Sequence, residues 1–307
     1  NGNNYLSDTN KLETNITNNF TYNSLDYITN FGLKNNFSLS LKNLNSIGKK
    51  TTLYKSNPQI ELASLFNIDF SMPFEKKDEI SENLLTPKMS FRFNPSDMKD
   101  NSSSDNKINV SNAFALNRLG LSDTLETGKS ITLGLDYKNE KKNDLNQINN
   151  YFELKLATVF RDKEEKFIPN KSTIHKKNSN LFGSITNKFS NNIDLSYNFS
   201  VDNDYKTLEY NDLNATFSIN NFITKFNFIE ESGEMGDTNS LASSFEYNLD
   251  KKNSFKFMTR RNRKLSLTEY YDLVYEYKND CLTAGIKYKK SYYSDGDLQP
   301  SENLLFT

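Results

Sequence analysis

Arg260, Arg261 and Arg263, followed by Lys264, form the densest basic cluster in the sequence. An arginine guanidinium can bind a phosphate group through two parallel hydrogen bonds, so the cluster could contact phosphate on an anionic glycolipid. A solvated hairpin tip would carry the same residue types and is the simpler interpretation. The sequence alone leaves both interpretations open.

Other residues that could do chemistry are few. Glu230, Glu231, Glu234 and Asp237 could bind a divalent cation at a membrane surface, but their spacing matches no calcium-binding loop. The single cysteine, Cys281, rules out an internal disulfide framework or a thiolate metal cluster. The single histidine, His175, lies among lysines in a stretch that we expect to be a solvated loop. We therefore expect no catalytic residues, no metal site and no cofactor.

The larger motifs of enzymes are also missing from the sequence. It contains no glycine-rich phosphate loop, no nucleophile elbow and no metalloprotease helix. The 38 basic and 39 acidic residues nearly cancel, giving a formal net charge of −1, so there is no basic footprint for nucleic acid. These absences predict a protein that is not an enzyme and has no nucleic-acid partner.

The elements that must position any site are indicated by a strict alternation of apolar and polar residues. Side chains of a β-strand point to opposite faces with a period of two, so each alternating segment has one apolar and one polar face. The pattern is clearest toward the C-terminal end and recurs along the chain. The main segments are 16–22, 37–41, 66–70, 89–93, 131–137, 152–160, 193–201, 213–219 and 282–288.

Composition favours strands that cross a membrane over strands of a soluble domain. Only 35% of residues are hydrophobic and the mean hydropathy is −0.75, yet aromatic residues reach 13% and lie in phase with the alternation. A barrel with lipid outside and water inside needs apolar residues on one strand face only. No run of about 18 apolar residues exists, which excludes a transmembrane helix. The prediction is an all-β fold, an antiparallel transmembrane outer-membrane β-barrel, with about 14 strands in this chain as part of a larger barrel.

The connections between predicted strands alternate in length. Short polar turns are expected at 190–192, 220–221, 250–253 and 278–280, with longer links between them and a long loop at residues 96–128. Bacterial barrels have short periplasmic turns and longer extracellular loops, so the short turns are expected on the periplasmic side.

Three stretches resemble a known family. They are the C-terminal hairpins EYYDLVYEYKNDCLTAGIKYKKSYYSDGDLQPSENLLF, the stretch LLTPKMSFRFNP (84–95) and the stretch FALNRLGLSDTLETGKSITLGLDY (114–137). In the first, a strand is followed by a turn containing Asn279, Asp280 and Cys281 and then by another strand. The sequence resembles the LptD family of lipopolysaccharide-assembly outer-membrane proteins over nearly its whole length.

The resemblance implies a function, a location and partners. It implies transport of lipopolysaccharide to the outer leaflet of the Gram-negative outer membrane by a barrel of about 26 strands. Residues 1–307 would then be a partial barrel domain, its C-terminal half or slightly more. The implied partners are lipopolysaccharide itself, outer-membrane lipid, an LptE-like lipoprotein plug in the lumen, and periplasmic jellyroll proteins that deliver the substrate. Lipid would leave by opening between the first and last strands of the full barrel.

The resemblance also implies a role for Cys281. Family members often join a cysteine near the C-terminus to one in the N-terminal domain, and Cys281 matches one such position. Because Asp280 precedes it where some members have a second cysteine, only one inter-domain disulfide is in prospect. The chain begins without Met and stops within the apolar run 304–306, which we interpret as a piece of a longer protein.

Two other interpretations of the alternation remain open. One is a general porin or substrate-specific outer-membrane channel, which predicts a constriction loop folded into the barrel and ion conductance without a lipoprotein partner. The other is a soluble β-sheet adhesion module, in which the apolar strand faces would pack against a second sheet.

Overall fold

The computed structural model describes residues 2–6, 11–51, 54–143, 147–189, 192–292 and 300–306. Within these ranges the chain is all-β, as predicted, apart from one short 3-10 helix, η1 (Asn170–Ser172). No helix in the described part of the chain has the length and apolar character needed to span a membrane.

The strands pair antiparallel in one large sheet. The described residues form 18 strands, more than the about 14 predicted; fourteen of them contain nine or more residues, and β1, β3, β6 and β18 are shorter. The strands are β1 (Gly2–Leu6), β2 (Leu12–Asn23), β3 (Tyr27–Ile28), β4 (Lys34–Lys49), β5 (Gln59–Ser71), β6 (Phe74–Lys77), β7 (Ser81–Asn94), β8 (Gly128–Lys142), β9 (Ile148–Arg161), β10 (Leu181–Phe189), β11 (Ile193–Val201), β12 (Leu208–Ile219), β13 (Phe222–Glu231), β14 (Asn239–Asn248), β15 (Asn253–Asn262), β16 (Leu267–Lys278), β17 (Thr283–Ser291) and β18 (Ser301–Phe306).

The chain divides into two compact units, which we describe separately. The first comprises Asn1–Phe74, Leu85–Asp136 and Leu156–Phe182, and the second comprises Glu75–Leu84, Tyr137–Lys155 and Gly183–Thr307. Strands β6 to β10 therefore each contribute residues to both units.

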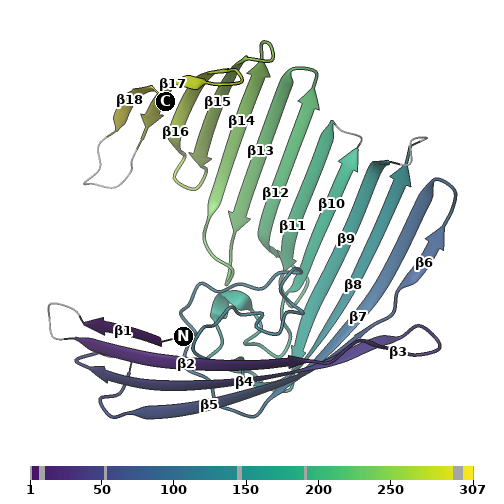
Figure 1. Cartoon of the computed structure of the whole chain (residues 1–307), viewed down its shortest axis with the longest axis vertical. Helices are drawn as coiled ribbons and strands as arrows, with labels where there is room; N and C mark the ends of the chain where they lie inside the picture. The colour runs from purple at the N-terminus through teal and green to yellow at the C-terminus, as the bar shows by residue number, and fades with distance from the viewer. Residues whose placement is uncertain are drawn as a thin grey trace. The chain divides into compact units, whose positions relative to one another are not determined.

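In the first unit, β2, β4, β5 and β7 (Figure 1) pair in that order, and their register sorts side chains by polarity. One row across three strands is apolar, with Phe37 opposite Ile68 and Ile68 opposite Phe91. The adjacent row is polar, with Ser38 opposite Asn67 and Asn67 opposite Arg92. A slip of one residue would mix the two faces, so the alternation itself fixes this register.

Strand β7 begins earlier than its proline suggests. A proline has no N–H to give to a ladder, so within a sheet it is usually found at an edge, at a bulge or at the first residue of a strand. The strand instead begins at Ser81 and runs through Pro87, whose carbonyl accepts a hydrogen bond from the Met72 N–H at 3.1 Å. The last register pair of β5 with β7 is Ser71 opposite Lys88, so Pro87 lies just outside that ladder and its missing N–H leaves the ladder intact.

In the second unit, β11 to β18 form a meander in which each strand pairs with the next, as Figure 1 shows for its green and yellow strands. Short turns join β12 to β13, β14 to β15 and β16 to β17, as predicted; the turn expected at 190–192 falls partly outside the described residues.

Asx chemistry closes two of these turns. The Asp250 carboxylate accepts hydrogen bonds from the backbone N–H groups of Lys252 (2.7 Å) and Asn253 (2.9 Å). The hydrogen bond from Lys252 and that from the Asn253 side chain lower the pKa of the Asp250 carboxyl. Asn279 Oδ1 accepts in the same way from the N–H groups of Cys281 (3.0 Å) and Leu282 (2.8 Å). Short polar side chains that bond to their own backbone explain why Asn and Asp occupy these positions.

Candidate functional site

The apolar face of the sheet is exposed in the first unit. On β7 the outward residues Met89, Phe91 and Phe93 are 36–40% exposed, whereas their neighbours Ser90 and Arg92 are at most 2% exposed. Strand β4 repeats the pattern. A soluble sheet buries its apolar face and exposes its polar one, and this unit does the reverse.

The second unit has the same exposed apolar face. The described outward side chains at or above about a third exposure include Leu213, Phe226, Leu241, Phe255, Leu273 and Ile286. The opposite face carries charged pairs, including Lys287 with Asp272 at 2.8 Å. Lys256 lies 4.0 Å from Glu246 on the same face. The predicted soluble module, with apolar faces packed on a second sheet, is therefore wrong for these strands.

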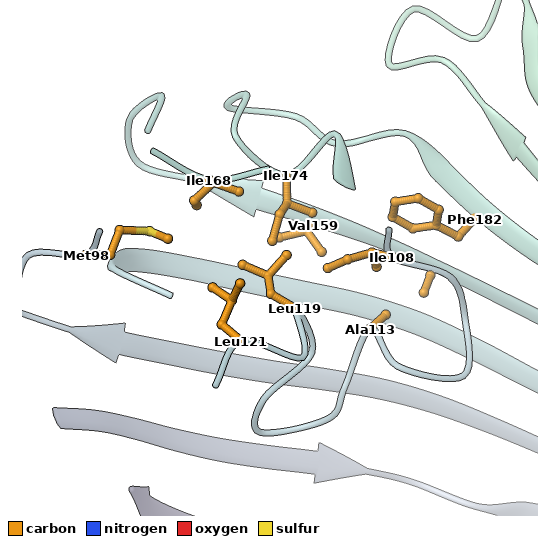
Figure 2. Close-up of a cluster of buried hydrophobic side chains, with 10 residues drawn as sticks. Met98, Ile108, Ala113, Leu119, Leu121, Val159, Ile168, Ile174 and Phe182 are labelled. Carbon is orange, nitrogen blue, oxygen red and sulfur yellow. The ribbon is translucent and has the colours of Figure 1, made fainter. Parts of the chain in front are cut away.

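The polar face of the first unit is covered by the connection between β7 and β8, residues 95–127. Met98, Ile108, Ala113, Leu119 and Leu121 of this connection are buried. They form a small hydrophobic core with two residues of the β9–β10 connection and with three from strands β9 and β10; these five are Ile168, Ile174, Ala157, Val159 and Phe182 (Figure 2). The long polar loop expected from sequence is thus a folded structure with its own core.

Gly134 on β8 leaves room for this packing. A Cβ at Gly134 would come within 2.7 Å of the Phe114 ring and 3.0 Å of the Leu156 carbonyl oxygen. Phe114 is partly buried and packs against the hydrophobic core. Glycine in a strand often marks such a close approach.

A buried charge cluster anchors the same connection. Arg118 binds Glu126 through two hydrogen bonds, Nε to Oε2 at 2.6 Å and Nη2 to Oε1 at 2.5 Å. Arg161, at the end of β9, donates from Nη1 to the same Oε1 at 2.5 Å. Arg118 also donates to Thr132 Oγ1 (2.9 Å) and Ser130 Oγ (3.0 Å) on β8. The cluster therefore links the connection to two strands, to β9 through Glu126 and Arg161 and to β8 through Arg118.

The electrostatics of Glu126 follow from this arrangement. Burial by itself raises the pKa of the Glu126 carboxyl, because it disfavours the charged form. The charge and hydrogen bonds of Arg118, with the charges of Arg92 and Arg161, outweigh burial and hold the pKa well below its ordinary value of 4.5. Glu126 is therefore ionised at neutral pH.

Strand residues reach up to the backbone of the connection as well. Lys42 Nζ on β4 donates to the carbonyl oxygens of Leu121 (3.2 Å), Ser122 (2.8 Å) and Thr124 (3.2 Å). On β7, Arg92 Nη1 donates to the Ala115 carbonyl at 2.8 Å. Buried carbonyl groups of irregular backbone need such donors, since water cannot reach them.

The structure separates the predicted arginine cluster. Arg260 forms an ion pair with Glu269 at 3.1 Å, and Lys264 pairs with Asp237. Arg261 lies opposite Leu241, and the Arg263 guanidinium stacks over the Phe228 ring at 5.4 Å from its centroid. Arg260 therefore belongs to a different face from the other two.

The remaining predicted residues are not brought into one site. Glu230 accepts a hydrogen bond from Asn239 at 2.9 Å, while Asp237 is committed to Lys264. In the described ranges no group of three or more His, Cys, Asp or Glu residues is arranged to hold a metal ion. His175 is half-buried in the folded β9–β10 connection, where its carbonyl accepts the Glu165 N–H at 2.8 Å. Cys281 is exposed in the turn between β16 and β17.

Sequence reasoning missed Arg118, Glu126 and Arg161. Arg92 could have been found, because it occupies a polar position in the alternating segment 89–94. Arg118 and Glu126 lie in irregular chain, where no periodicity indicates which face a residue takes.

Comparison with known proteins assigns the chain to a family. A search of curated proteins finds no match. A family model, LptD: LPS transport system D, matches residues 50–252, well over half of the chain, and spans β5 to β14 together with the connection 95–127. The chain therefore belongs to the LptD family, non-enzymatic β-barrels that transport and assemble lipopolysaccharide at the outer membrane, which confirms the predicted family, function and location.

Proposed function

We propose that residues 1–307 form part of the barrel wall through which lipopolysaccharide passes, with the polar strand face lining the aqueous interior. The observation that carries this proposal is the inverted polarity of the strands. Phe91 and Phe93 are exposed on one face, while Arg92 between them is 2% exposed beneath a folded connection. An apolar face of this kind suits lipid, and a polar face suits the sugar part of an amphiphile.

The folded connection 95–127 would narrow this interior. It is held by buried charge pairs and by a hydrophobic core, which supports a fixed position for it and not that of a loose loop. A narrowed interior would let the strand wall handle a large amphiphile while limiting leakage of small solutes.

Cysteine labelling in lipid vesicles tests the assignment of the two faces. In a Cys281→Ser background, Leu273→Cys places a thiol on the apolar face and Met258→Cys places one on the polar face. We expect a water-soluble maleimide to label the Met258→Cys protein at least about tenfold faster, because lipid excludes the reagent from the other face. Equal labelling rates would contradict the proposal.

A channel is the second candidate, because a loop folded onto the polar face is also what a porin predicts. The two functions differ in conductance. A porin should conduct ions steadily in a planar bilayer without any lipoprotein partner, whereas a lipopolysaccharide transporter with a narrowed interior should conduct weakly. The family match favours the transporter.

We also propose an LptE-like lipoprotein in the interior and periplasmic jellyroll proteins as the source of substrate; family membership supports both. Co-purification of a lipoprotein with the tagged protein from outer membranes tests the first. Site-specific crosslinking of the short-turn end to a periplasmic jellyroll tests the second.

Cys281 is proposed to form an inter-domain disulfide. Its exposed position in a short turn, at the end expected to face the periplasm, supports this. On non-reducing gels, Cys281→Ser should abolish a fast-migrating oxidised form of the full-length protein. An unchanged pattern would refute the bond.

A further inference from the structure

The outward face of the second unit ends in a pair of arginines. Residues Leu213, Phe228 and Leu241 lie opposite one another on β12, β13 and β14, and Arg261 on β15 continues this row. Leu213 is 40% exposed and Leu241 is 36% exposed. Arg261 therefore borders an exposed apolar strip, on the same strand face.

Arg263 is held beside this strip. Its guanidinium lies over the Phe228 ring, and its backbone N–H donates to the Asn239 carbonyl at 2.8 Å. Stacking on an aromatic ring orients the guanidinium and leaves its N–H groups able to bind an anion. This contact places one cation at the edge of the apolar strip.

No acidic side chain among the described residues neutralises either arginine. Among the described residues, Arg261 and Arg263 form no ion pair and no side-chain hydrogen bond, and both are exposed. Their neighbours are committed, Arg260 to Glu269 and Lys264 to Asp237. The four-residue basic cluster of the sequence is therefore reduced to two available cations next to apolar surface.

We propose that Arg261 and Arg263 bind the phosphate group of a glycolipid in the outer leaflet, whose acyl chains lie along the strip formed by Leu213, Phe228 and Leu241. This inference rests on the proposed function, which places the apolar face in lipid. Two guanidinium groups at the border of an apolar face match a ligand that joins an anionic headgroup to hydrocarbon. The arginines also lie at the end of the unit that carries the longer connections 202–207 and 232–238, which is the expected extracellular end, although their own connection, 263–266, is as short as the turns at the other end.

The binding of lipid A to the full chain in detergent tests the site. The probes are bis-phosphorylated lipid A and the same glycolipid without phosphate groups. Losing both bidentate contacts in an Arg261→Gln/Arg263→Gln variant should raise the Kd for bis-phosphorylated lipid A by about tenfold or more. Arg260→Gln is the matched control, because it removes one cation of the same cluster from the opposite face, and its Kd should change less than about twofold.

The outcomes separate the sources of anion binding. The dephosphorylated glycolipid should bind the wild-type protein as weakly as bis-phosphorylated lipid A binds the double variant. Equal affinity of the wild-type protein for both glycolipids, an unchanged Kd in the double variant, or full displacement by millimolar inorganic phosphate would overturn the proposal.

A second double variant tests the site if the Arg261→Gln/Arg263→Gln protein does not fold. Arg261→Lys/Arg263→Lys keeps both charges and removes the bidentate geometry, so it should fold and bind bis-phosphorylated lipid A several-fold more weakly. Wild-type affinity in this variant would also contradict the site. If Arg261 and Arg263 do not bind the glycolipid, the labelling rates of Leu273→Cys and Met258→Cys should still differ. Failure of the arginine site is therefore distinguishable from failure of the proposed function.

Discussion

Glu126 joins Arg118 and Arg161, residues far apart in the chain, on one buried carboxylate. A buried ion pair adds little stability when both partners are replaced by apolar groups, but the removal of one partner leaves charge buried without compensation. The position of Glu126 is therefore more sensitive to substitution than any exposed acid of the connection. This sensitivity could not be predicted from the sequence, because nothing in residues 95–127 marks one acid as buried, whereas the polar position of Arg92 follows from strand alternation.

Glu126→Gln should destabilise the anchored connection by about 3–5 kcal/mol, because two buried arginines lose their carboxylate. Limited proteolysis within residues 95–127 and urea unfolding from detergent would measure the effect. Asp105→Asn is the control in the same connection. Asp105 forms an exposed ion pair with Lys171, so this substitution should change stability by less than about 1 kcal/mol. Similar losses in both variants would argue against the buried cluster as the anchor.

Acid should release the connection through Glu126. The folded-state pKa of Glu126 is below its ordinary value of 4.5, so its contribution is complete above pH 4.5 and is lost as the pH falls through the lowered pKa. We expect protection of residues 95–127 from hydrogen exchange, corrected for intrinsic rates, to be constant from pH 7 to 5 and to decline only below that range. In Glu126→Gln this decline should be absent, and a decline of equal size there would assign it to other groups.

At the scale of elements, the alternation of apolar and polar residues predicted the long strands and their faces, because a two-residue period can be recognised in the sequence wherever one strand face meets lipid. The packing of connections was not predictable in this way. Residues such as Ile108 and Leu119 stand in irregular chain without periodicity, and their burial depends on contacts with β9 and β10 distant in sequence. The passage of β7 through Pro87 depends in the same way on a partner distant in sequence, because it is tolerated only where the β5 ladder stops.

The junction of the connection with β8 should be intolerant of a side chain at Gly128. Its φ is +86°, and an added Cβ would lie 2.8 Å from Arg161 Nη2, the group that donates to the Thr127 carbonyl. We expect Gly128→Ala to lose about 1–2 kcal/mol from backbone strain alone and more from displacement of Arg161.

Gly120→Ala is the matched control for Gly128→Ala. Gly120 also has a positive φ, +65°, but the nearest atom to its added Cβ is Asn106 Nδ2 at 3.7 Å. Urea unfolding of both variants should show the greater loss for Gly128→Ala. If the two losses are equal, crowding of Arg161 contributes nothing.

At the scale of the whole molecule, family membership establishes lipopolysaccharide transport at the outer membrane and implies partners related to lipopolysaccharide. The structure adds a wall with an apolar exposed face and a polar face that carries a folded connection. The sequence predicted the wall and its function through strand alternation and the resemblance of three segments. It did not predict that the long connection is a folded structure anchored on the polar face of the strands.

Cells that carry Glu126→Gln should become more permeable to large hydrophilic antibiotics such as vancomycin, because a loosened connection would no longer narrow the interior. The minimum inhibitory concentration should fall at least about fourfold relative to wild type, with comparable amounts of protein in the outer membrane. Cells with Asp105→Asn should match wild type. An unchanged concentration in Glu126→Gln cells would show that residues 95–127 do not limit leakage.

The hydrophobic core shared by the two connections limits how these segments can be exchanged between related proteins and how their sequences can change. Residues 95–127 and 162–180 both contribute side chains to that core, Leu119 and Leu121 from one and Ile168 and Ile174 from the other. Exchanging either segment alone for that of a related barrel would leave the two sides of this hydrophobic core mismatched. Chimeras should keep their fold only when both segments are transplanted together, and substitutions in one segment should be accompanied by compensating substitutions in the other.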